Sequence, residues 1–178
     1  MAAYNVFLAN LGNALTQEQR DQVRTTLQGW FGQIANTDGA MVQWVTSAPT
    51  ISDHELLIYF VPSEMNSVAR SLPGYSGSAG SGDGFTVWAG NLSTSEVYVS
   101  RSRGWLAEIA FHECLHNKLH LGDRDLHALD GLARVPVVAG SQPSANNITR
   151  MRRALTNRHT QWTGGWGAYS DPLAELGL

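Results

Sequence analysis

Cysteine is almost absent from this chain: Cys114 is the single one in 178 residues, so no disulfide can form within the chain. Charge is also scarce, with 15% charged residues and a net charge of −3 at pH 7. Because nucleic-acid-binding proteins usually carry a basic stripe, we expect no nucleic-acid partner. The 43% share of hydrophobic residues is typical of a globular protein.

Long apolar runs are missing as well. None approaches the length of a transmembrane helix, so we expect no membrane partner. Residues 1–10 have neither the basic start nor the long apolar run of a signal peptide. We therefore expect a protein that is cytoplasmic, exported without a cleaved signal peptide, or a mature form whose leader has been removed. The length predicts a single domain spanning 1–178, and we expect a monomer.

The hydrophobic pattern predicts more strands than helices. A nearly continuous apolar run at 55–61 is typical of a central strand, and the other predicted strands are 3–8, 41–46, 85–89 and 97–100. Three helices are predicted. The first begins at Thr16, which has capping-box spacing to Gln19, and ends between residues 32 and 39. The second covers 103–121 and is ended by Gly122, and the third covers 146–155. We predict an α+β fold with a mixed, mostly parallel twisted sheet, one backing helix, a helix beneath the sheet over 103–121, and a small C-terminal helical subdomain. The boundary between an N-terminal α/β subdomain and that C-terminal part is placed at about 121/122.

The stretch 71–84 is rich in glycine and serine and predicts a loop. Such a loop could be a flap beside a cleft or a tolerated surface insertion, and the sequence leaves both interpretations open.

Four of the six histidines fall between 112 and 127. Among them, His112, Glu113 and His116 form the pattern HExxH. Residues i and i+4 of a helix share a face, so the two imidazoles can bind one zinc ion at roughly 2.0–2.1 Å. The carboxylate of Glu113 would point into the same cleft and take a proton from a water molecule on the metal. The competing interpretation is a surface helix that happens to carry histidines. Cys114 fits a small buried residue on the rear of this helix.

The motif, together with the order of strands and helices over residues 3–121, resembles the zincin metallopeptidases. In that superfamily an α/β subdomain places the HExxH helix on the floor of a cleft, and a C-terminal part supplies the third zinc ligand. The chain is most similar to the metzincins, whose signature HExxHxxGxxH is often followed by Asp. Residues 112–117 fit its start, and Asp123 matches the trailing Asp. However, Leu119 stands where the family has Gly, and Gly122 stands where it has the third His. No Met-turn is apparent, since Met151 fits a core position in a helix.

The third ligand has to be predicted from reach and chemistry. On a continuous helix His120 lies two turns from His112, about 12 Å of rise, and could join the metal only if the helix broke at Asn117. His127 lies five residues beyond the turn at Gly122, and imidazole suits zinc. We therefore predict that His112, His116 and His127 bind one zinc ion per chain. The alternatives left open are His120, Asp123, Asp125 and Asp130.

The resemblance implies a zincin-like fold and a peptide or protein substrate. Three protein ligands leave a fourth position open, which is the catalytic arrangement. We therefore predict a zinc-dependent metallopeptidase, a hydrolase, in which Glu113 is the general base and returns the proton to the leaving amine. Glu108 lies one turn before His112 and could hydrogen-bond one of the metal-binding residues. Candidates for stabilising the oxyanion are Tyr75, His159 and Tyr169.

Two other classes of function stay open. A non-catalytic zincin-fold protein that binds a partner, or travels as cargo or as a toxin, would keep the metal site but would not need Glu113. A histidine-rich protein that stores or senses metal would hold several ions and hydrolyse nothing. A small secreted or injected protease toxin or effector would fit the size of the chain and the missing leader.

Overall fold

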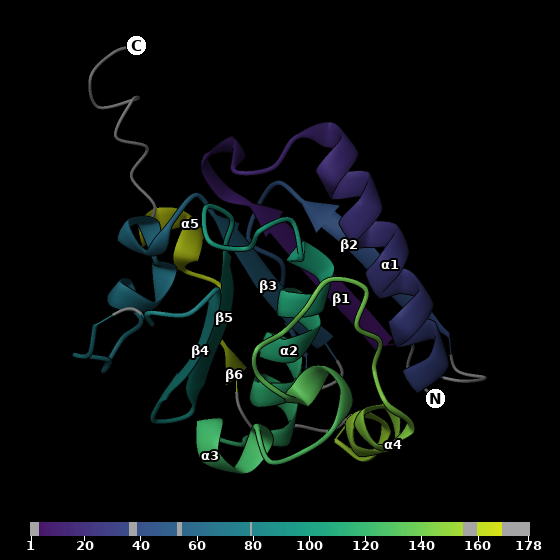
Figure 1. The fold of residues 1–178 in the computed structure, drawn as a ribbon. Coiled ribbons are helices and arrows are strands. Elements are labelled where there is room, and N and C mark those ends of the chain that lie inside the picture. The colour runs from purple at the N-terminus through teal and green to yellow at the C-terminus, as the bar shows by residue number, and fades with distance from the viewer. Residues whose placement is uncertain (1–3, 36–38, 53–54, 79, 155–159, 169–178) are drawn as a thin grey trace.

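The computed structural model describes residues 4–35, 39–52, 55–78, 80–154 and 160–168 (Figure 1). The strands are β1 Tyr4–Asn10, β2 Ala40–Val45, β3 Glu55–Val61, β4 Gly84–Ala89, β5 Leu92–Tyr98 and β6 Thr160–Gln161. The α-helices are α1 Gln17–Ala35, α2 Leu106–Leu119, α3 Asp123–Leu126, α4 Ala145–Arg153 and α5 Gly165–Ala168. Short 3-10 helices form at η1 Leu11–Asn13, η3 Glu64–Asn66, η4 Val68–Ser71 and η5 Gly131–Ala133.

The strands form one mixed sheet in the order β2-β1-β3-β5-β4, with β6 beside β5. All pairs are parallel except β4, which runs antiparallel to β5. The predicted fold class, α+β with a mixed, mostly parallel sheet, is confirmed at this level. Among the strands that the structure describes, β4 pairs with β5 alone and therefore forms an edge of the sheet.

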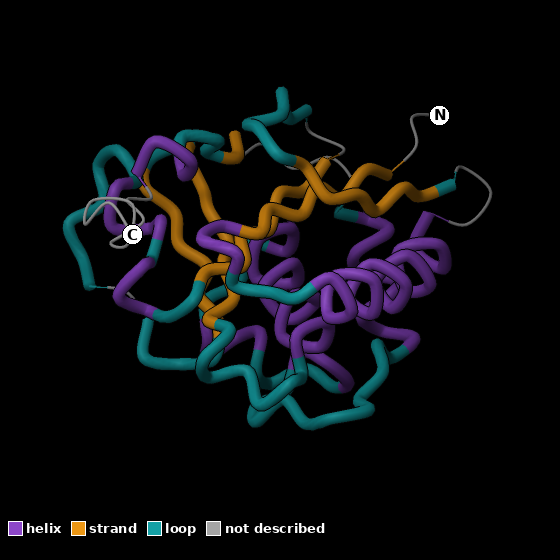
Figure 2. The backbone as a smooth tube through the Cα atoms, turned by 90° about the horizontal axis from the view of Figure 1, so that it is seen from above, coloured by secondary structure: helices purple, strands orange, loops and turns teal. Residues whose placement is uncertain are grey.

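The two long helices, α1 and α2, pack on one face of the sheet, as Figure 2 shows. The larger core lies between that face and the helices, and it includes Leu27, Phe31, Leu56, Phe60 and Phe111. A smaller core on the opposite face joins β1, β3 and β5 to Val68 and to two partly buried tryptophans, Trp162 and Trp166. Because both faces of β3 are covered, alternate side chains enter different cores, which explains its continuous apolar run.

Several predicted boundaries were wrong. Strand β5 runs from Leu92 to Tyr98 and not over 97–100, because its first half is polar and carries no apolar signal. Helix α2 ends at Leu119, before Gly122, since His120 adopts the left-handed conformation with φ +52°. The short elements α3, α5 and β6 were not predicted.

The predicted division of the chain near residue 121 stays a prediction. Beyond it, Leu126, Leu132 and Met151 enter the larger core, and Met151 is buried as the sequence predicted. Among the described residues, none of the helices combines the length and the apolar character needed to cross a bilayer.

Candidate metal centre

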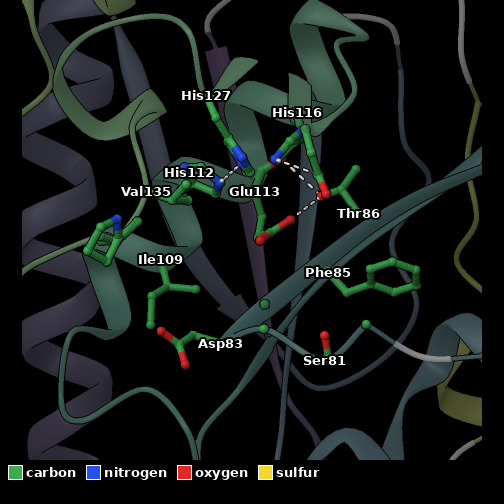
Figure 3. A pocket seen from close by; sticks show the side chains of 16 residues that line it. Ser81, Asp83, Phe85, Thr86, Ile109, His112, Glu113, His116, His127 and Val135 are labelled. Atoms are coloured by element: carbon green, nitrogen blue, oxygen red, sulfur yellow. Dashed lines mark hydrogen bonds and ion pairs between the residues drawn. The ribbon is translucent and has the colours of Figure 1, made fainter. Parts of the chain in front are cut away.

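Three histidines converge beside α2. His112 and His116 lie one turn apart on this helix, are 5% and 6% exposed, and have ring centroids 4.8 Å apart. After α2 ends, the chain turns back through α3, and the ring of His127 lies 5.2 Å from that of His112 and 5.3 Å from that of His116. One ligand atom from each residue lies within 4.8 Å of the other two. Figure 3 shows the three rings pointing toward one another, so this group could bind a metal ion.

Backbone carbonyls set the orientation of the two helical rings. The Nδ1 of His112 lies 2.7 Å from the carbonyl oxygen of Leu132, and the Nδ1 of His116 lies 2.7 Å from that of Leu121. A carbonyl oxygen only accepts, so Nδ1 carries the hydrogen in both rings and the lone pair lies on Nε2. The Nε2 of His127 lies 3.3 Å from the Nε2 of His112. The ring nitrogens of the three residues thus approach one another, and the outer nitrogens of His112 and His116 are already hydrogen-bonded, as in protein metal sites.

Burial keeps these imidazoles in the neutral form that binds metals. It lowers the pKa of His112 to about 4 and also lowers the pKa of His116. The hydrogen bonds to Leu132 and Leu121 oppose this shift without reversing it. Neither ring therefore has to lose a proton at neutral pH before it binds a cation.

Glu113 lies in the same cavity, 5% exposed. Its Oε2 accepts a 2.6 Å hydrogen bond from the hydroxyl of Thr86 on β4. Burial raises the pKa of Glu113 to about 8, and the Thr86 hydroxyl partly opposes that rise. A nearby cation would favour the ionised carboxylate and lower this pKa.

The cavity has a volume of about 490 Å³. One wall is the glycine-rich segment 80–84, which leads into β4, and another is the apolar stretch Val135–Val137. The predicted loop therefore borders the candidate centre, so the structure favours a cleft wall over a remote surface insertion.

The alternative third ligands lie elsewhere or at the rim. His120 is exposed and packs against Trp88 with 4.6 Å between ring centroids. Asp130 accepts hydrogen bonds from Ser144 and Asn146. Asp123 lines the cavity, but its side chain is 88% exposed and lies 3.8 Å from the Nε2 of His116. Asp125 is exposed and does not line the cavity.

Two other predicted site residues, Glu108 and Tyr75, are not in the cavity. The carboxylate of Glu108 accepts from the backbone of Gly140 and not from a candidate ligand. Tyr75 donates its hydroxyl to the carbonyl of Ser78, and none of the described residues that line the cavity is a tyrosine. His159 and Tyr169 lie outside the described residues. Cys114 is buried among apolar residues, as the sequence predicted.

The sequence did not reveal two supports of the centre. One is Thr86, on β4. The other is Asn147 on α4, which is fully buried and bridges the segment that carries Leu132: its Oδ1 accepts from the Leu132 backbone and its Nδ2 donates to the Asp130 carbonyl. Gly131 has φ +61° and packs so closely on Asn147 that a Cβ there would lie 2.4 Å from its Oδ1. Asn147 thereby fixes the carbonyl that orients His112.

No protein-family model, curated protein or solved structure matches the chain. The geometry of the site is therefore the basis for assigning a function.

Proposed function

We propose that this chain is a zinc-dependent metallopeptidase of the zincin type, with Glu113 as its general base. The observation that supports it is the arrangement of three convergent imidazoles and one buried carboxylate around a single open cavity. Helix α2 supplies His112, Glu113 and His116, and the turn back through α3 supplies His127.

The donor set fits zinc. Three convergent imidazoles, two of them buried and one partly buried, are a common catalytic zinc environment, and His127 comes from beyond the end of helix α2, so it can approach without distorting that helix. When bound, zinc would supply Lewis-acid activation of water and of a carbonyl group. An adjacent cation would also help to ionise Glu113, whose pKa burial raises to about 8.

The chain's own residues would then handle the proton. Glu113 would accept a proton from the attacking water and deliver it to the nitrogen of the leaving amine. The glycine-rich segment 80–84 offers backbone with little side-chain bulk along the cavity, where an extended peptide could approach. The apolar stretch at Val135–Val137 would contact substrate side chains on the other wall.

Metal content is the first test. We expect one zinc ion per chain by elemental analysis of the purified protein, lost in His127→Ala and kept in His120→Ala. The second variant is a matched control, because His120 lies against Trp88 and outside the cavity. Several ions per chain would instead favour a metal store, and loss of zinc only in His120→Ala would refute the ligand set.

Hydrolysis is the second test. Zinc-loaded protein should cleave members of a mixed peptide library, and mass spectrometry detects the cleaved peptides. Glu113→Gln should keep its zinc and lose about 10²- to 10⁴-fold in kcat. Wild-type protein that binds zinc and cleaves no peptide would favour the non-catalytic binding class.

A further inference from the structure

Two residues of the edge strand β4 lie against the carboxylate of Glu113. Gly84 and Thr86 are two residues apart, so both face α2. A Cβ at Gly84 would lie 2.7 Å from the Oε1 of Glu113 and 2.8 Å from its Cγ, so a larger residue would push the carboxylate away. The Thr86 hydroxyl lies 2.6 Å from Oε2. One carboxylate oxygen is thus hydrogen-bonded while the other lies against a residue of the cavity wall.

The Thr86 hydroxyl is itself held by a chain of buried polar groups. It lies 2.9 Å from the hydroxyl of Ser95 on β5, and the Nδ2 of Asn117 donates to the Ser95 hydroxyl at 3.1 Å. Asn117 lies one turn after Glu113 on α2, so this series of hydrogen bonds begins and ends on the same face of the helix.

The direction of these hydrogen bonds follows from the chemistry of each group. An amide nitrogen only donates, so Ser95 accepts from Asn117. An ionised carboxylate only accepts, so Thr86 donates its single hydrogen to Oε2 of Glu113 and accepts in turn from the Ser95 hydroxyl. Every donor points toward the carboxylate, and hydrogen bonds aligned in this way polarise and strengthen one another.

Burial makes this arrangement hard to replace with solvent. Ser95 and Asn117 are both 0% exposed. Buried polar groups cost free energy unless they are hydrogen-bonded, so an alternative orientation of any member would leave its neighbour unpaired.

We propose that Thr86 is a positioning residue for the general base: its hydroxyl, backed by Ser95 and Asn117, fixes Oε2 of Glu113 so that Oε1 stays at the cavity wall to exchange the proton. This inference rests on the proposed role of Glu113. A catalytic group is effective only when it is held close to its productive orientation. Without the hydroxyl, the carboxylate would rotate about its terminal torsion and spend less time in that orientation.

Kinetics of three variants test the positioning role. Thr86→Val keeps the β-branched shape and removes the hydroxyl, so kcat should fall about 10- to 100-fold with KM and zinc content unchanged. Thr86→Ser restores the hydroxyl and should recover most of kcat. The matched control is Thr94→Val, which removes a buried hydroxyl from β5 that has no hydrogen-bond partner among the described residues; its kcat should equal that of the wild type.

A second experiment tests the contact without relying on hydrolysis. Urea unfolding of Thr86→Val, Glu113→Ala and the double variant forms a thermodynamic cycle, with alanine at 113 because the amide oxygen of glutamine would still accept from Thr86. We expect the two substitutions to be coupled by about tenfold in the unfolding equilibrium constant. The peptide-binding affinity of Glu113→Gln should not change when Thr86→Val is added, because the binding groups are not altered.

The outcomes separate this inference from the proposed function. Absence of coupling, or a Thr86→Val variant with wild-type kcat, overturns the positioning role and leaves the metallopeptidase proposal standing. Strong coupling in a zinc-loaded protein that hydrolyses no peptide overturns the proposed function, and the positioning role with it, while the contact itself is verified. A rise in KM at constant kcat in Thr86→Val would assign Thr86 to substrate binding and would also overturn the inference.

Discussion

Strands β3 and β5 are neighbours in the sheet and equally buried, yet they are built from opposite kinds of residue. From Leu56 to Val61, β3 is apolar at every position, and each side chain is 0–1% exposed. From Ser93 to Glu96, β5 is polar at every position, and each of those side chains is also 0–1% exposed. Burial alone therefore does not tell the two strands apart, and their roles have to be read from their partners.

The partners show that β3 packs into apolar cores, whereas two residues of β5 contact groups beside the candidate centre. Side chains of β3 enter two apolar cores, where burial is favourable. Ser93 and Ser95 of β5 accept hydrogen bonds from Asn117 on the helix that carries the HExxH motif. A sheet built only for stability would use apolar residues at these positions, because polar groups gain little from burial. Ser93 and Ser95 instead hold Asn117, and Ser95 also supports Thr86 beside Glu113.

The largest effect on stability is expected when a large side chain of β3 is removed. Phe60→Ala should lower the free energy of unfolding by about 3–5 kcal/mol, because it leaves a cavity in the larger core and removes the packing on Trp44. Urea denaturation followed by circular dichroism measures the loss. A loss below about 1 kcal/mol would show that the core relaxes into the space, and the assignment of β3 to stability would fail.

The same contrast explains what the sequence could predict. The strand at 55–61 was found with its boundaries because an apolar run is a local signal. The first half of β5 was missed because Ser93–Glu96 resembles a polar loop in composition. Its burial depends on Ser67 and Tyr98, which donate hydroxyls to Glu96, and on Asn117, which lies more than twenty residues further along the chain. The pattern of residues within the strand therefore does not predict these distant hydrogen-bond partners.

The candidate centre divides in the same way. His112, Glu113 and His116 are visible because the spacing of one helical turn is written in the sequence. His127 was inferred from ligand chemistry and reach, and the structure places it beside the other two. Thr86 and the carbonyl of Leu132 could not be inferred, since a threonine in a strand and a backbone carbonyl carry no signal before the fold brings them to α2.

A smaller loss is expected when a polar contact of β5 is broken. Ser95→Ala removes the group that accepts from Asn117 and supports Thr86. The free energy of unfolding should fall by about 1–3 kcal/mol, because two buried polar groups lose a partner. The measurement is urea unfolding next to the wild type. An unchanged stability would mean that the hydroxyl contributes nothing, and the comparison between β3 and β5 would lose its energetic basis.

The support on the other side of α2 can be tested through metal affinity. Asn147→Ala should free the segment that presents the Leu132 carbonyl to His112 and weaken zinc binding by about 10- to 100-fold. Competition with a chromophoric chelator measures this affinity. Thr149→Ala, at an exposed position on the same helix, is the control and should bind zinc like the wild type. Equal weakening in both variants would point to loss of α4 as a whole.

Glu96 makes the cost of polar burial depend on pH. Burial raises its pKa above the usual 4.5, although Ser67, Tyr98 and the backbone of Val68 oppose the shift. The folded state thus holds this proton more tightly than the unfolded state. The stabilising contribution is complete below pH 4.5 and is lost as the pH rises through the raised pKa. Wild-type stability should therefore fall with pH relative to that of Glu96→Gln, and parallel pH profiles in thermal unfolding would contradict this.

The smallest effect is expected at Thr94, which sharpens the comparison within β5 itself. Its hydroxyl is buried like that of Ser95 but has no hydrogen-bond partner among the described residues. Thr94→Val keeps the shape and removes an unpaired polar group, so the free energy of unfolding should stay the same or rise by up to about 1 kcal/mol. Urea unfolding of this variant and of Ser95→Ala under the same conditions gives the contrast. If both variants lose the same stability, the fold requires polar side chains throughout the buried half of β5. If only Ser95→Ala loses stability, the fold requires only the hydroxyls that are hydrogen-bonded to the groups around Glu113.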